Sequence, residues 1–103
     1  MITETVYLDR DNINSLELRA NGSAQDITAT SRMTLKAGDT LLDSNRHSNV
    51  FDWTTNGTSG QVDLTLGHQA LKVGLYRATL TIFDNTYPSG LVWGDFMLDV
   101  KEA

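Results

Sequence analysis

"GQVDLTLGHQALKVGLYRATLTIFD", residues 60–84, decides the fold class, because its apolar residues recur at every second position. This period is typical of a strand with one buried face, whereas an amphipathic helix repeats about every 3.6 residues. The stretch therefore predicts two strands joined by a short connection, in which Leu71 fills the core as a plug. The predicted inward positions are Val62, Leu64, Leu66, Tyr76, Ala78, Leu80 and Ile82.

Turn signals separate similar alternating segments in the first half of the chain. Asn21-Gly22 follows the alternating residues 16–20, and this pair suits a tight hairpin because both positions favour a positive φ. Gly38-Asp39 separates residues 32–36, with Met33 and Leu35 inward, from the apolar pair at 41–42. The sequence therefore predicts two hairpins before residue 45.

The number and spacing of these segments point to an all-β fold. About seven short strands, turn signals at intervals of about 8–12 residues and no amphipathic helix are typical of a sandwich. We predict a single immunoglobulin-like antiparallel β-sandwich over residues 1–103, with room for one short helical turn near residues 68–72. A small closed barrel is the alternative.

Composition and charge exclude several function classes. The net charge is -5, from 13 acidic against 8 basic residues, which argues against nucleic acid as a partner. No cysteine is present, so disulfides and thiolate metal sites are excluded. The opening residues lack the pattern of a secretory signal, and no apolar run suits a membrane helix. We expect a protein made unprocessed in the host cytoplasm, with no membrane partner.

The residues capable of chemistry do not form a recognisable site. His47 and His68 lack the neighbours that a zinc site needs, and no serine lies in a Gly-x-Ser-x-Gly elbow. Asp9, Asp11, Asn12 and Asn14 could offer oxygens to calcium, but their spacing fits a turn with Asx hydrogen bonds better. The sequence therefore predicts no enzyme activity, no cofactor and no metal.

The last strand raises the question of a protein interface. Val92, Phe96, Leu98 and Val100 share one parity and are expected to face the core. The opposite parity, together with the neighbouring strand, then forms an outward apolar patch, which is a candidate protein interface: Phe83, Leu91, Trp93 and Met97. The alternative is a β-bulge at Gly94 that reverses the register and turns Trp93 into the core.

Three motifs, in this order, resemble a known module. They are Asp26-Ile27-Thr28, "GQVDLTL" at residues 60–66 and "GLYRATL" at residues 74–80. They are similar to the Asp-Leu-Thr-like step and the Gly-x-Val-x-Leu-x-Leu and Gly-x-Tyr-x-x-x-Leu strands of the immunoglobulin-like N-terminal module of phage upper-baseplate and tail-fibre-attachment proteins. The resemblance covers nearly the whole chain and implies a phage virion structural protein.

This resemblance sets the functional expectation. The chain is expected to be a non-enzymatic virion component that docks on other virion proteins, in several copies or as a homo-oligomer. The family implies a tail, baseplate or fibre-attachment position, whereas the short length suits capsid decoration. One alternative is a carbohydrate-binding module for host glycans, which needs an exposed row of aromatic side chains drawn from Tyr7, Trp53, Tyr87 and Trp93. Another is a small inhibitor of a host protein.

Overall fold

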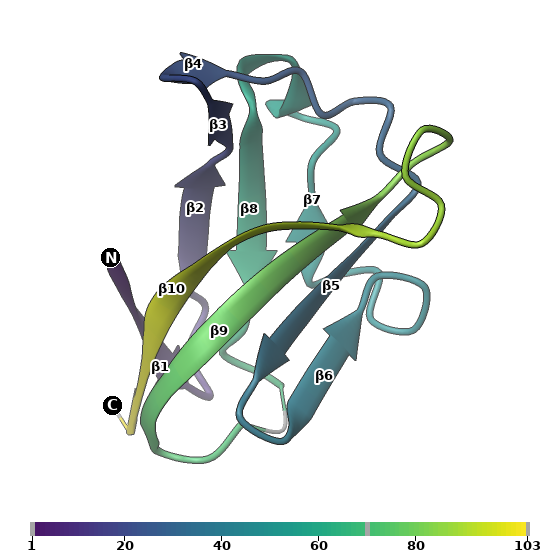
Figure 1. Ribbon diagram of the computed structural model, residues 1–103. Helices are drawn as coiled ribbons and strands as arrows, with labels where there is room; N and C mark the ends of the chain where they lie inside the picture. Colours follow the sequence, from purple (N-terminus) through teal and green to yellow (C-terminus); the bar gives the residue numbers. More distant parts are fainter. Residues whose placement is uncertain (1, 70, 103) are drawn as a thin grey trace.

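Two packed β-sheets form the body of the molecule (Figure 1). The computed structural model describes residues 2–69 and 71–102. Within these residues the chain forms ten strands and one short 3₁₀ helix. The predicted all-β sandwich is confirmed.

The larger sheet has five strands in the order β1-β10-β9-β5-β6. Its strands are β1 (Thr3–Leu8), β5 (Arg32–Ala37), β6 (Thr40–Asp43), β9 (Gly74–Phe83) and β10 (Leu91–Glu102). β1 is parallel to β10, which corrects the predicted wholly antiparallel arrangement, and the other neighbours are antiparallel. β10 has 12 residues and β1 has 6, so β10 is twice as long as the strand that pairs with it.

The smaller sheet has the order β2-β8-β7. Its strands are β2 (Ile13–Glu17), β7 (Phe51–Asp52) and β8 (Gln61–Thr65), while β3 (Arg19–Ala20) and β4 (Ser23–Ala24) form a separate hairpin. β2, β7 and β8 lie in one sheet, while β5, β9 and β10 lie in the other. This distribution of strands between two sheets is that of an immunoglobulin-like sandwich.

One hydrophobic core lies between the sheets. The predicted inward residues of β8 are fully buried, those of β9 from Ala78 onward are at most 4% exposed, and Leu71 is buried as the predicted plug. Met33 and Leu35 supply the core from β5. Since alternate residues of several strands meet in this single cluster, the period of two correctly predicts the core.

Both predicted hairpins are present. Asn21 and Gly22 have φ angles of 54° and 80°, which are the positive values that a two-residue turn between β3 and β4 requires. Gly38, at φ 59°, lies in the turn between β5 and β6.

The predicted helical turn near residues 68–72 includes residue 70, which lies outside the described residues. Residues 68, 69, 71 and 72 are in turns, bends or irregular structure, and the 3₁₀ helix is instead at Gly57–Ser59. In the described part of the chain, no helix has the length and apolar character needed to cross a membrane.

The alternation of β10 is reversed by a bulge, so the parity predicted for its first residues is wrong. Leu91 lies opposite Ile82 and Val92 opposite Thr81, but the register shifts before Gly94 lies opposite Leu80. Leu91 and Trp93 consequently pack against the core, while Val92 is 61% exposed. Phe96, Leu98 and Val100 are buried as predicted. The bulge alternative describes this strand correctly.

Candidate functional site

The four residues of the predicted interface patch do not share one face. Leu91 and Trp93 pack against the core, whereas Phe83 and Met97 lie on the outer face of the larger sheet. Met97 is opposite Arg77, six residues along β9 from Phe83, which is about 20 Å at the rise of a strand. The structure therefore splits the patch into a core-facing pair and two separate outward side chains.

β10 instead offers an unpaired backbone edge, which the sequence did not reveal. β1 pairs only with Met97–Glu102, and no other strand of the described residues lies beside Leu91–Phe96 on that side. We call Leu91–Phe96 the open edge. The amide of Met97 donates to the carbonyl of Ile2 at 2.8 Å, so the backbone groups of Asp95, two residues earlier, point toward the same side. Figure 1 shows the N-terminal end of the chain beside β10.

An apolar groove lies next to the open edge, between β10 and β2 of the opposite sheet. We call it the edge groove, and its volume is about 120 Å³. Its apolar lining is Ile2, Leu16, Leu18, Leu80, Trp93 and Phe96. The exposed residues Glu17 and Asp95 also line it. The groove thus combines an apolar floor with an unpaired strand.

The carboxylate of Asp95 lies on the outer face of the larger sheet and is held ionised there. Arg77 donates from Nε to Oδ2 at 2.9 Å and Thr79 donates to Oδ1 at 3.1 Å. The hydrogen bond from Arg77, then the one from Thr79, lowers the pKa of Asp95 below its ordinary value. Glu17 accepts a hydrogen bond from Arg19 at 2.7 Å.

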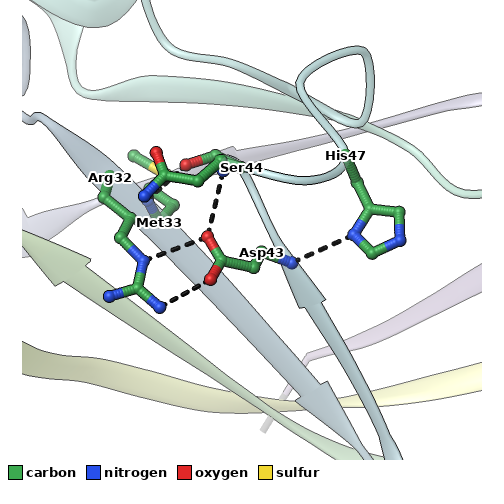
Figure 2. A network of polar contacts seen from close by, with 6 residues as sticks. Arg32, Met33, Asp43, Ser44 and His47 are labelled. Carbon is green, nitrogen blue, oxygen red and sulfur yellow. Dashed lines mark hydrogen bonds and ion pairs between the residues drawn. The ribbon is translucent and has the colours of Figure 1, made fainter.

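A polar network lies at the opposite border of the larger sheet, on β5 and β6 (Figure 2). The Arg32 guanidinium donates to both carboxylate oxygens of Asp43, at 3.0 and 2.5 Å, and lies 4.6 Å from the ring centroid of Phe83. The Arg32 hydrogen bond lowers the pKa of Asp43, with help from the Asn45 amide. His47 accepts a hydrogen bond from the Asp43 amide at 3.4 Å. Phe83, part of the predicted patch, is therefore stacked with Arg32.

The polar residues considered for metal binding make structural contacts, and Asn14 is buried in β2, where its side-chain amide donates to the Thr5 carbonyl at 3.0 Å. The Asn12 side-chain amide donates to the carbonyls of Tyr7 and Arg10, both at 2.9 Å, which closes the turn after β1. His68 contacts Asp11 at 2.8 Å on the surface. No three His, Cys, Asp or Glu side chains within the described ranges are grouped so that they could hold a metal ion.

The four aromatic side chains proposed for a sugar platform do not form one row, although Trp93 and Tyr87 line the same cavity. The Trp53 indole packs against the core and donates to the Thr30 carbonyl at 3.0 Å, and Trp93 also packs against the core. Tyr7 lies opposite Lys101 near the end of β10, whereas Tyr87 lies in the connection that precedes β10. These positions do not form a flat exposed row.

Two features of the sequence could have indicated the open edge. Gly94 interrupts an otherwise apolar strand, and a glycine inside a strand often marks a bulge. β1 is also half as long as β10, so it pairs with only the second half of that strand. Their pairing could not be read from the sequence, because strands at opposite ends of the chain carry no local signal for one another.

The chain matches no protein-family model and no curated protein.

Proposed function

We propose that this chain is a non-enzymatic bacteriophage virion structural protein that docks on other virion subunits through its β-sandwich. Three resembling motifs support the proposal. In the fold, "GQVDLTL" forms β8 and its flanks, and "GLYRATL" forms the first part of β9. Ile27 of the first motif donates to the Gly57 carbonyl at 2.9 Å, beside the start of the 3₁₀ helix.

The open edge is the observation that carries the proposal. A sandwich with fully paired or charged borders avoids other chains, whereas an unpaired strand beside an apolar groove favours contact with one. The opposite border, β6, is also an edge strand, but it carries the Arg32–Asp43 ion pair. Docking through β10 gives a directional contact, which is what a repeated particle component needs.

The proposal covers a tail, baseplate or fibre-attachment position as well as capsid decoration, and the partners are other virion proteins present in several copies. The carbohydrate-binding alternative gains no support from the arrangement of the aromatic side chains, because Trp53 and Trp93 pack against the core.

Particles purified from a culture that produces this chain test the proposal. Quantitative mass spectrometry should find the chain in a fixed ratio to the other particle proteins. The ratio should survive a wash in about 1 M salt, because apolar and backbone contacts are not screened by ions. A chain abundant in the lysate but missing from the particles would contradict the proposal and favour the inhibitor of a host protein.

A further inference from the structure

The open edge and the edge groove lie side by side, and together they resemble a strand position that has been left vacant. Unpaired backbone groups on Leu91–Phe96 provide the hydrogen bonds of one strand, and the groove provides space for side chains on its inner face. We propose that this site binds an extended peptide segment of a partner protein as an additional β-strand, with a branched aliphatic side chain in the groove and basic residues at its ends.

The backbone defines the class of ligand. The unpaired stretch covers six residues, which corresponds to about 20 Å of extended chain. A helix or a compact small molecule cannot satisfy a row of alternating N–H and C=O groups, whereas an added strand bonds to them in register. The added strand also continues the line of β1, which already pairs with the second half of β10.

The groove defines the inner side chains. Its volume of about 120 Å³ suits one medium-sized aliphatic group, and Leu16, Leu18 and Phe96 line it with apolar atoms. A strand presents alternate side chains to one face, so an aliphatic residue at every second position directs its side chain toward the groove. Valine and isoleucine also favour extended backbone.

Charge defines the ends of the segment. The whole chain carries a net charge of -5, whereas Glu17 and Asp95 beside the groove are each already paired with an arginine. A segment flanked by lysine or arginine is therefore attracted, while an acidic one is repelled.

This inference rests on the proposed docking function but is tested without particles. The probe is the synthetic peptide acetyl-KTVTVTK-amide, titrated into the full ¹⁵N-labelled chain and followed by NMR. We expect saturable shift changes confined to the amides of residues 91–96 and of residues 16–18 across the groove. The peptide acetyl-KTSTSTK-amide has the same charge without the aliphatic groups and should bind at least about tenfold more weakly.

Two arginine variants provide a matched pair at opposite borders of the larger sheet. A Cβ at Gly94 meets no atom within 4 Å, and the residue is not among those with positive φ, so Gly94→Arg is expected to fold while filling the groove. Leu41→Arg alters an exposed residue of β6, the edge strand on the other side. Gly94→Arg should abolish the shift changes and Leu41→Arg should preserve them, with unchanged spectra elsewhere showing that both variants fold.

The inference is overturned if the valine peptide causes no saturable shifts at millimolar concentration, or if the serine peptide binds equally well. It is also overturned if Leu41→Arg abolishes binding and Gly94→Arg does not, because β6 is then the docking strand. A chain that is found in particles but fails these tests loses only the strand-addition inference. Peptide binding by a chain that is absent from particles contradicts only the virion proposal.

Discussion

Trp93 is the residue that contributes most to the packing behind the open edge. Its side chain packs against the core and lines the edge groove on the side of Leu16 and Leu18. It also lines a second cavity of about 120 Å³ on the side of Ile27 and Tyr87. The indole therefore separates two spaces at the border of the sandwich and supports the inner side of an edge that has no strand beyond it.

Trp93→Ser is expected to lower the free energy of unfolding by about 2 kcal/mol, less than for a fully buried tryptophan, because part of the ring contacts solvent. Val92→Ser is the control, since Val92 points outward and its change should stay within about 0.5 kcal/mol. Urea denaturation followed by fluorescence of the remaining tryptophan, or by circular dichroism, measures both. Equal effects of the two changes would contradict the bulge.

Asp43 makes the stability depend on pH. The Arg32 hydrogen bond lowers its pKa in the folded protein below the ordinary value of 3.8. The unfolded chain therefore takes up a proton first, so the stabilisation is complete above about pH 4 and is lost as the pH falls through the folded pKa.

Denaturation at pH 7 and at pH 3 should thus show a smaller acid-induced loss for Asp43→Asn than for the unmodified chain. Asp39→Asn is the matched control, because Asp39 is exposed in the neighbouring turn. An acid-induced loss of the same size in Asp43→Asn would show that the Arg32–Asp43 pair does not contribute.

At the scale of strands, alternation predicted most elements and most of the core, but it did not predict β1. β8 and β9 follow the period of two along their length, so a single sequence was sufficient to assign their faces. β10 was assigned wrongly before Gly94, because a bulge adds one residue and reverses the parity that precedes it. The site was missed for a related reason, since the groove joins Leu16 and Leu18 with residues about 75 positions further along the chain.

Two glycines, one just after β8 and one within β10, test this description. A Cβ at Gly67, just after β8, would lie 2.1 Å from the Arg10 carbonyl oxygen, a backbone atom in the turn after β1. Gly67→Ala should therefore destabilise the fold by about 3 kcal/mol, because the turn must move. Gly94→Ala meets open space and should change stability by less than about 0.5 kcal/mol. Thermal unfolding of both variants is the measurement, and a tolerated Gly67→Ala would contradict the close approach of these two loops.

At the scale of the whole molecule, the two borders of the five-stranded sheet differ in kind. One ends in β6, where Asp43 pairs with Arg32, and the other has the open edge beside an apolar groove. A body that offers an unpaired strand beside an apolar groove at one border binds in one orientation. This asymmetry, together with the resembling motifs, supports a repeated component of a particle.

Imaging of intact particles at side-chain resolution tests the central claim most directly, because it locates the chain and its neighbours together. The account predicts that a strand of a neighbouring subunit lies along Leu91–Phe96 with an aliphatic side chain between Trp93 and Leu16. A particle in which this edge faces solvent while the chain is held through β6, or one that lacks the chain, would contradict it.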